Sequence, residues 1–575
     1  MDWVKKYFEI KNASTKKIVL ILIAIGFIIY CNTFFNQFFW DDFDSIVNNQ
    51  YIRSWSNFPK FFSQNLTAGA GTINNYWRPL LLISFAADYS IGKISPFIYH
   101  LQSTFWHILS AILIFLIFSK ILKNNFISFL TSLLFLIHPL QTEATTYVAG
   151  RADPMHSALM LLSFLFFLKS IEIPRIFNKK YLLSILFFIL ALLVKERAII
   201  FPSLIVLYFI TLCPEKIKNN LKRKFKIVLP FFLVSFLYFI LRIKFIHFNE
   251  TFDFGQRNNI GAENLLHQLF AYFKGIWVYT GLIFWPARLY MEKSIGISKT
   301  FFDFQTILGF LIIILSFIAT IYSFKNKKII AFGLIWFYAT LSPSLHIYPI
   351  QGLLYEHWLY FPLIGIFFIF SSLIHSLINQ TKNENIKKII LFLVLMSALS
   401  LGIRTMIRNR DWDNPTRFYE KNISLGGYSA RVYTNLGMAY SENKKEEEAL
   451  AYYQKSIELS PYNYQTWYDM GNSYSSLKEK DKAIDSYTKA IEVNPYFFPS
   501  YYNQAAIYID QKQVKEAIDI LNKALEKDPD NLQTIYNLGV VYYNDGNKEK
   551  ARENFKKVLE KDPYNPDLIR LINSL

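Results

Sequence analysis

The sequence predicts an all-α protein in two parts: a polytopic membrane helical domain followed by an α-solenoid of short helical repeats. Three observations support this prediction. Hydrophobic residues make up 53% of the 575-residue chain, long apolar runs recur over roughly its first 410 residues, and from residue 428 onwards three sets of residues repeat at an interval of 34. So much apolar surface is typical of a chain that lies in a membrane.

Eleven apolar runs are interpreted as membrane spans of a domain that covers residues 18–410, after a cytoplasmic segment 1–17. Several of the runs are shorter than the roughly 20 residues that a straight span needs, so their ends are approximate. The runs are 18–35, 96–118, 126–139, 155–169, 181–194, 198–213, 227–247, 303–324, 329–346, 358–378 and 387–405.

The charge distribution predicts the topology of these spans. Residues 1–427 carry a net charge of +21 and residues 428–575 one of −3. With the N-terminus inside, the strongly basic loops all fall on the cytoplasmic side, as the positive-inside rule requires. A further run, 269–287, would break this rule as a span, so we expect residues 269–290 to form an amphipathic or re-entrant segment on the outer face. The chain is therefore expected to be a multi-pass protein of the cell (inner) membrane.

The 34-residue repeat follows a predicted linker, residues 411–427. Small residues allow paired helices to approach closely, large residues fill the gap between them, and a proline ends each unit. The pattern resembles four tetratricopeptide repeats, 428–461, 462–495, 496–529 and 530–563, with a cap at 564–575. They follow an odd number of spans and should lie outside the cytoplasm. The repeating positions are Gly437, Gly471, Ala505 and Gly539; Ala449, Ala483, Ala517 and Ala551; and Pro461, Pro495, Pro529 and Pro563.

Composition excludes other classes of protein. Cys31 and Cys213 are the only cysteines, which makes a disulfide framework or a Cys-based zinc site unexpected. The basic residues accompany the apolar runs and form no patch on a soluble face, so nucleic acid is not an expected partner. His100 and His107 share one helix face, where buried hydrogen-bonded histidines are favoured over metal ligands.

Charged residues gather in the loops expected on the outer face. Asp41 and Asp42 follow an apolar cluster, where mutual repulsion raises one pKa and suits a general base; the alternative is a solvated turn. Arg151 and Lys195, and behind them Arg78 and Arg197, are candidates to bind a phosphate. The alternatives for these cations are ion pairs such as Arg151 with Asp153, or anchoring at the membrane interface.

The order of these motifs resembles that in the transmembrane and tetratricopeptide-repeat-containing O-mannosyltransferases, glycosyltransferases of the GT-C fold. Ser103 stands where that family usually has Asn, Arg197 follows Lys195-Glu196, and four repeats are fewer than in animal members, which with the composition suggests a bacterial relative. The resemblance is carried by Phe39-Trp40-Asp41-Asp42, Trp77-Arg78-Pro79-Leu80, Tyr99-His100 to His107, His138-Pro139 to Glu143, Gly150-Arg151-Ala152-Asp153, Lys195-Glu196 and the repeats.

This resemblance implies transfer of one mannose-like sugar from a polyprenyl-phosphate donor to an acceptor hydroxyl, with inversion, on the extracytoplasmic face. Asp41 or Asp42 would take the proton, while the spans hold the lipid tail and the repeats bind an acceptor protein, a glycan or a protein partner. No cofactor is required, and nothing in the sequence supports a divalent metal. Supporting roles fall to His138, Glu143, Asp153, Glu196, His100 and His107.

Two alternatives remain open from the sequence. The spans could merely anchor a non-catalytic repeat scaffold in the membrane. Alternatively, the enzyme could be a lipid-linked polysaccharide ligase or polymerase, which transfers a whole glycan instead of one sugar.

Overall fold

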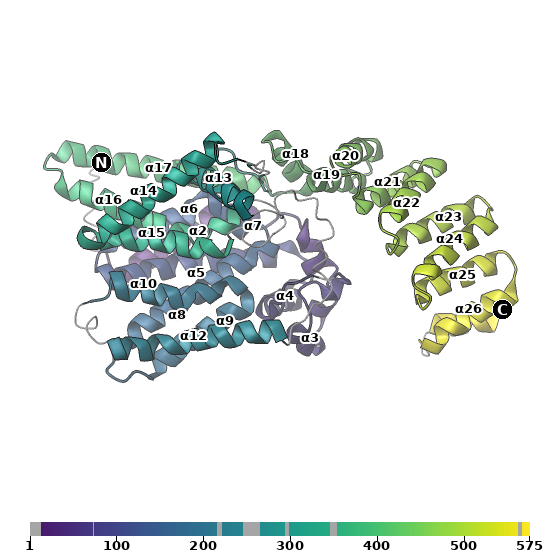
Figure 1. The fold of residues 1–575 in the computed structure, drawn as a ribbon, viewed down its shortest axis with the longest axis horizontal. Helices are drawn as coiled ribbons and strands as arrows, with labels where there is room; N and C mark the ends of the chain where they lie inside the picture. The colour runs from purple at the N-terminus through teal and green to yellow at the C-terminus, as the bar shows by residue number, and fades with distance from the viewer. Residues whose placement is uncertain are drawn as a thin grey trace. The chain divides into compact units, whose positions relative to one another are not determined.

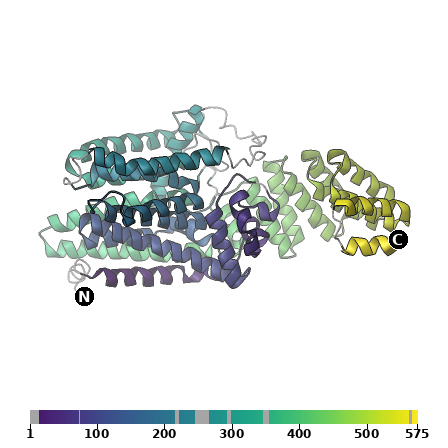
Figure 2. The same cartoon turned by 90° about the horizontal axis from the view of Figure 1, so that it is seen from below.

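The computed structural model describes residues 13–72, 74–214, 221–244, 265–291, 293, 298, 300–344, 354–561 and 566–574. The chain forms two compact units, Met1–Gly427 and Tyr428–Leu575, referred to here as unit 1 and unit 2. Every regular element in the described ranges is a helix, and Figures 1 and 2 show the elongated helices of unit 1 lying side by side. The all-α prediction is confirmed.

A helix of unit 1 occurs at each of the eleven predicted apolar runs. Six of the described helices are long and apolar enough to cross a membrane, and a seventh span results if α6 and the bent segment after it count as one. The total of eleven spans stays a prediction. The helices are α2 (Thr15–Tyr30), α5 (Pro96–Leu122), α6 (Asn125–Ile137), α8 (Ala152–Ser170), α9 (Lys179–Val194), α10 (Phe201–Thr211), α12 (Leu221–Lys244), α14 (Phe304–Asn326), α15 (Lys328–Leu341), α16 (Leu363–Gln380) and α17 (Glu384–Arg410).

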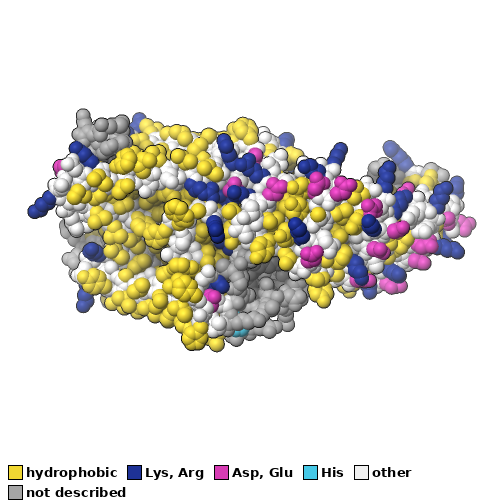
Figure 3. Space-filling model, turned by 90° about the horizontal axis from the view of Figure 1, so that it is seen from above, with side chains coloured by type: hydrophobic (Ala, Val, Ile, Leu, Met, Phe, Trp, Pro, Cys, Tyr) yellow, Lys and Arg dark blue, Asp and Glu magenta, His cyan; other side chains and the backbone are white. Residues whose placement is uncertain are grey.

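The surface of unit 1 is largely apolar. Figure 3 shows hydrophobic side chains over much of this unit, whereas charged side chains of both signs are frequent on unit 2. Phe317 of α14 is 66% exposed and Leu237 of α12 is 63% exposed. A soluble domain rarely exposes such continuous apolar faces, so this surface fits a lipid environment.

Short helices gather at one end of unit 1. We call this end the loop end and define it by α7 (Thr142–Thr146), η8 (Glu196–Ile200) and η10 (Glu356–Leu359). Proline at the first helical turn starts several of these elements, as is common where the missing N–H costs no hydrogen bond. The short elements are α3 (Phe58–Ser63), α4 (Pro79–Gly92), η6 (Pro139–Gln141), α7 (Thr142–Thr146), η7 (Ala149–Arg151), η8 (Glu196–Ile200), η10 (Glu356–Leu359) and α18 (Pro415–Ser424).

The segment expected at 269–290 contains α13 (Leu265–Phe284), a continuous helix that is not among the candidate spans. Its second half reaches the loop end, where the hydroxyl of Tyr279 donates to the carbonyl of Tyr355 at 3.0 Å and a ring nitrogen of His138 lies 3.1 Å from the carbonyl of Ile283. The amphipathic or re-entrant placement of this segment stays a prediction.

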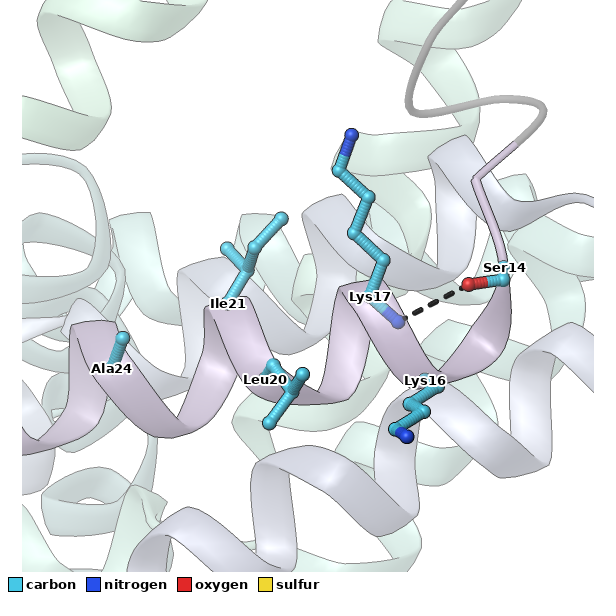
Figure 4. Close-up of a pocket in the computed structure, with 6 residues that line it drawn as sticks. All are labelled: Ser14, Lys16, Lys17, Leu20, Ile21 and Ala24. Carbon is cyan, nitrogen blue, oxygen red and sulfur yellow. Dashed lines mark hydrogen bonds between the residues drawn. The ribbon is translucent and has the colours of Figure 1, made fainter.

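A hollow beside the first turns of α2 contains none of the candidate residues. In Figure 4 its lining comes from a single helix and its N-cap, Ser14, whose hydroxyl accepts a hydrogen bond from the backbone of Lys17 at 3.3 Å. The hollow is a surface feature of one helix start.

Unit 2 consists of four antiparallel helix pairs and a final helix, as the 34-residue period predicts. Successive pairs bury a continuous core, and Leu568 of the last helix packs on the final pair. The pairs are α19 (Ala430–Glu442) with α20 (Glu446–Leu459), α21 (Tyr464–Ser476) with α22 (Lys480–Val493), α23 (Phe498–Asp510) with α24 (Val514–Lys527), and α25 (Leu532–Asn544) with α26 (Lys548–Lys561), before α27 (Pro566–Ser574).

The small residue of each repeat faces the large one across the helix pair. A methyl group added at Gly539 would meet a ring carbon of Phe555 at 2.5 Å, and the same holds for Gly437 and Gly471 with their tyrosine partners. The third repeat has Ala505 at this position, and its partner is Leu521 instead of an aromatic ring. The size of the partner therefore decides whether the repeat needs glycine.

This pairing predicts that Gly539→Ala destabilises the fourth repeat by about 1–3 kcal/mol, because the ring of Phe555 has no room for the methyl group. Adding Phe555→Leu should recover part of the loss, since it recreates the packing of the third repeat. Hydrogen exchange of peptides from 530–563 in the full-length protein measures the effect. Equal protection in Gly539→Ala and wild type would contradict the packing argument.

Candidate active site at the loop end

The carboxylate of Asp42 joins two loops of unit 1. Its Oδ1 accepts a hydrogen bond from the backbone N–H of Ala149 at 2.7 Å, and its Oδ2 accepts one from Phe39 at 3.3 Å. The side chain is 1% exposed, and burial raises its pKa to about 8, against the ordinary value of 3.8. Asp42 is thus a buried structural carboxyl group that holds the loop after α2 against the residues before α8.

Asp41, its neighbour, has an exposed side chain. Its backbone N–H donates to the hydroxyl of Tyr147 at 3.0 Å, so the main chain is fixed while the carboxylate remains accessible. Of the two aspartates, Asp41 is therefore the one placed to exchange a proton with a bound molecule.

An aromatic cluster packs behind the aspartate pair. Phe39 lies 5.6 Å from Trp412 and 4.9 Å from Phe418 between ring centroids, and Tyr147 lies 5.6 Å from Trp412. The backbone of Gln37 also donates to the carbonyl of Asp413 at 3.0 Å. Residues 411–427, expected to be a linker, thus belong to unit 1, because their aromatic side chains are buried in its core.

Arg151 is buried inside unit 1 and is not exposed at all. Its guanidinium forms an ion pair with Asp88 at 2.6 Å and donates to the carbonyl of Tyr99 at 2.7 Å. The hydroxyls of Ser84 and Ser103 and the side-chain oxygen of Gln102 are further acceptors. The structure therefore gives Arg151 an internal partner set that ties η7 to α4 and α5, instead of an open phosphate-binding position.

Lys195 and Asp153 form a buried ion pair at 2.7 Å between Nζ and Oδ1. Burial lowers the pKa of Lys195 to about 8, opposed by the attraction of Asp153. Because Asp153 is only four residues from Ala149, a single segment, 147–153, contacts the aspartate loop at one end and Lys195 at the other.

Further cations surround this pair. Arg78 bonds to Glu196 at 3.0 Å, and Arg242 lies 3.9 Å from the same carboxylate. Arg197 stacks on Trp358 with 5.4 Å between its guanidinium carbon and the ring centroid. Within the described ranges its guanidinium makes no hydrogen bond or ion pair, so Arg197 is available to a ligand.

We call Arg78, Lys195, Arg197 and Arg242, with their carboxylate partners, the cationic group. Asp153 and Glu196 supply two negative charges against four positive ones, which leaves a net charge of +2. Such an excess at a partly buried site favours an anionic ligand.

A second ionic network lies beside the cationic group. Glu143 contacts His357 at 2.6 Å, and Glu356 contacts Lys293 at 2.6 Å and Arg408 at 3.6 Å. The Oε2 of Glu143 also accepts from the backbone N–H of Glu356 at 2.9 Å. The network fixes η10, the turn that contributes Trp358.

The remaining candidate histidines have structural contacts. A ring nitrogen of His100 lies 3.1 Å from the carbonyl of Asn36, and His107 lies 2.8 Å from the hydroxyl of Tyr360. His138 caps η6 by accepting from Leu140. In the part of the chain that the structure describes, no three His, Cys, Asp or Glu side chains form a group that could hold a metal ion. The two cysteines are not bonded to one another.

A narrow apolar pocket adjoins Trp358. Its other lining residues come from α13, the end of α15 and the segment before η10: Tyr272, Gly275, Ile276, Tyr279, Leu341 and Leu354. The pocket is too small for a hydrocarbon chain, and it leaves apolar surface beside Trp358, the ring on which Arg197 lies.

Several site residues escaped the sequence analysis. Asp88, Arg242, Lys293 and Arg408 lie within or beside apolar runs and belong to no short motif, so spacing alone gave no signal for them. A charged residue within an apolar run was the available clue, because such residues are costly unless they are paired or functional.

Fold and site together define a multi-pass membrane protein with a charged site at one end and a tetratricopeptide-repeat domain after it. The family model "Cytochrome c-type biogenesis protein H TPR domain" matches residues 428–567. Unit 2 is also similar to the crystal structure of MamA, with 24% identity and a TM-score of 0.24 over 26% of this chain and 86% of that one.

Two relatives extend the similarity to unit 1. Protein O-mannosyl-transferase F38B6.6 of Caenorhabditis elegans is 25% identical over 445 residues, 75% of this chain and 61% of the relative. Protein O-mannosyl-transferase TMTC3 of Mus musculus is 22% identical over 466 residues, 76% of this chain and 50% of the relative. The chain thus spans half to about three-fifths of these relatives, and its resemblance to the transmembrane and tetratricopeptide-repeat O-mannosyltransferases is confirmed.

The raised pKa of Asp42 predicts a stability that falls with rising pH. The folded protein keeps this proton up to about pH 8, whereas the unfolded chain releases it near pH 4, so folding loses about 1.4 kcal/mol per pH unit between these values. Thermal unfolding in detergent from pH 5 to 9 measures the slope. Asp42→Asn should flatten it and Asp41→Asn should not; an unchanged slope in Asp42→Asn would refute the assignment.

The buried pair predicts that Arg151→Met costs about 3–5 kcal/mol of stability, because it leaves Asp88 buried without its cation. The double variant Arg151→Met, Asp88→Leu should regain most of this loss. Lys480→Met, which removes an exposed pair with Asp510, is the control and should cost under about 1 kcal/mol. If thermal unfolding shows Arg151→Met to be as stable as this control, the internal role of Arg151 is wrong.

Proposed function

We propose that this protein is an integral-membrane glycosyltransferase that moves one mannose-like sugar from a polyprenyl-phosphate carrier to an acceptor hydroxyl. The observation that supports it best is Arg197, whose guanidinium lies on Trp358 and forms no hydrogen bond or ion pair with the described residues, within a group of net positive charge. The segment 147–153 connects this group to the loop that carries the exposed Asp41. The named activity of the relatives agrees with this proposal.

Asp41 is the general base in this proposal. As the acceptor oxygen attacks the anomeric carbon, its proton passes to the Asp41 carboxylate, and the bond from that carbon to the phosphate oxygen breaks with its electron pair on the phosphate. Attack from the side opposite the leaving group inverts the anomeric carbon. Asp42 holds the loop in place through Ala149.

The cationic group stabilises the leaving phosphate. A donor phosphodiester carries one negative charge and the released lipid phosphate carries up to two, so a site with an excess of two positive charges interacts more strongly as the reaction proceeds. This role falls to Lys195, Arg197, Arg78 and Arg242. Arg151 instead stabilises the fold through its buried ion pair with Asp88. Since these cations neutralise the phosphate, the proposal requires no divalent metal.

The lipid-facing helices accommodate the hydrocarbon chain of the carrier. The basic loops opposite the loop end support an extracytoplasmic position of the site, by the positive-inside rule. The repeats then bind the acceptor or a partner. The acceptor hydroxyl in this proposal is that of a protein Ser or Thr residue.

The test is to incubate the full-length protein in lipid nanodiscs with polyprenyl-phosphate mannose, glucose and arabinose and an acceptor peptide, and to measure released lipid phosphate. Asp41→Asn should lower the rate at least 100-fold because the base is lost. Arg197→Gln should lower it about tenfold or more, because it removes charge from the leaving group. Chelation of divalent ions should leave the rate unchanged.

Lys480→Met, on the surface of unit 2, is the control and should keep the wild-type rate. Mass spectrometry of the acceptor distinguishes one added sugar from a transferred glycan, which would indicate a ligase or polymerase. A protein that releases no lipid phosphate with any donor, and whose cellular role survives Asp41→Asn, would be a membrane-anchored scaffold.

A further inference from the structure

One imidazole at the loop end is held by a buried carboxylate. The Nδ1 of His357 lies 2.6 Å from the Oε1 of Glu143; the glutamate side chain is 1% exposed and the histidine side chain 22%. Because the Oε2 of Glu143 accepts from the backbone of Glu356, the same carboxylate fixes both the ring and the turn that carries it. The ring is therefore oriented with Nδ1 as the donor to Glu143.

Among the residues that the structure describes, none forms a hydrogen bond with the Nε2 of His357. The ring lies 5.2 Å from Tyr355 and 6.3 Å from Trp358 between centroids. Trp358 is therefore a common neighbour of His357 and Arg197.

Charged groups from several elements lie around His357. Glu143 of α7 is in direct contact, and Asp153 of α8 is within electrostatic range. Lys293 and Arg408 lie beyond Glu143 and are themselves paired with Glu356. Tyr279 of α13 donates its hydroxyl to Tyr355 instead of to the ring. Two carboxylates thus lie on the inner side of the imidazole, and no described residue accepts a hydrogen bond from its outer edge.

We infer that His357 is a further phosphate ligand: its Nε2–H donates a hydrogen bond to a phosphate oxygen of the lipid carrier, while Glu143 fixes the ring. This inference rests on the proposed function, because it assigns His357 to the leaving group of that reaction. The bonds that form and break are those already described, with the acceptor proton on Asp41 and the electron pair on the phosphate; His357 donates a hydrogen bond and keeps its proton.

The position of His357 distinguishes this role from that of a general base. Asp41 belongs to the cluster of Tyr147 and Trp412, whereas His357 belongs to that of Trp358, Arg197 and Asp153. A base must reach the acceptor hydroxyl, and a phosphate ligand must lie among the cations. The histidine meets the second condition.

The test measures binding of farnesyl phosphate, a short isoprenyl phosphate, to the full-length protein in detergent by ³¹P NMR and equilibrium titration. His357→Asn keeps a donor near the Nδ1 position and removes the one at Nε2. It should raise the Kd for farnesyl phosphate about tenfold, the usual effect of losing a charge-assisted hydrogen bond. Binding of farnesol, which has the same chain without the phosphate, should not change.

Two variants complete the comparison. His357→Gln keeps a neutral donor near the Nε2 position and should recover part of the affinity, which also answers the case in which the asparagine variant folds poorly. His375→Asn, in α16 and bonded to Asn124 and Asn379, is the control and should bind as wild type.

An unchanged Kd for farnesyl phosphate in His357→Asn would overturn the inference, and so would an equal loss of farnesol binding, since the ring would then only shape the lipid pocket. A loss confined to kcat for sugar transfer, with phosphate affinity intact, would show a base and also overturn it. If His357 supports phosphate binding but wild type transfers no sugar, the proposed reaction fails while the phosphate contact stands.

Discussion

The hydrogen bond from the backbone of Ala149 to the carboxylate of Asp42 is the contact on which the candidate site depends. It is a partly buried 2.7 Å bond between parts of the chain 107 residues apart. Arg151, two residues after Ala149, contacts α4 and α5. Asp153, four residues after Ala149, pairs with Lys195, directly before η8. Without it, Asp41 and the cationic group would not be held in fixed positions relative to one another, because they come from separate loops.

The pairing of charges in unit 1 distinguishes residues that stabilise the fold from residues that can bind a ligand. In an apolar environment an ion without a partner is costly, so most buried charges here are matched, as in Arg151 with Asp88 and Lys293 with Glu356. Among the described residues, Arg197 and the outer nitrogen of His357 are exceptions at the edge of the site. These two groups can bind a ligand without first breaking an ion pair, whereas Lys195 and Arg78 contribute charge from within theirs.

The sequence was informative wherever a periodic or local pattern determines the structure. The 34-residue registers identified four helix pairs, and each predicted apolar run contains a helix. The sequence could not assign Arg151, because its partners Asp88 and Ser103 come from other helices and nothing local indicates them. Residues 411–427 have no such period, and only the structure shows that Trp412 and Phe418 pack into unit 1.

Burial of Trp412 and Phe418 behind the aspartate loop also determines where the repeats are attached. Helix α18 ends at Ser424 and unit 2 begins at Tyr428, so the tether between the aromatic cluster and the first repeat is only a few residues long. Three extended residues reach only about 10 Å, so the first repeat starts within that distance of the end of α18. A connection this short passes a displacement of the first repeat on to α18, whereas a long flexible linker would absorb it.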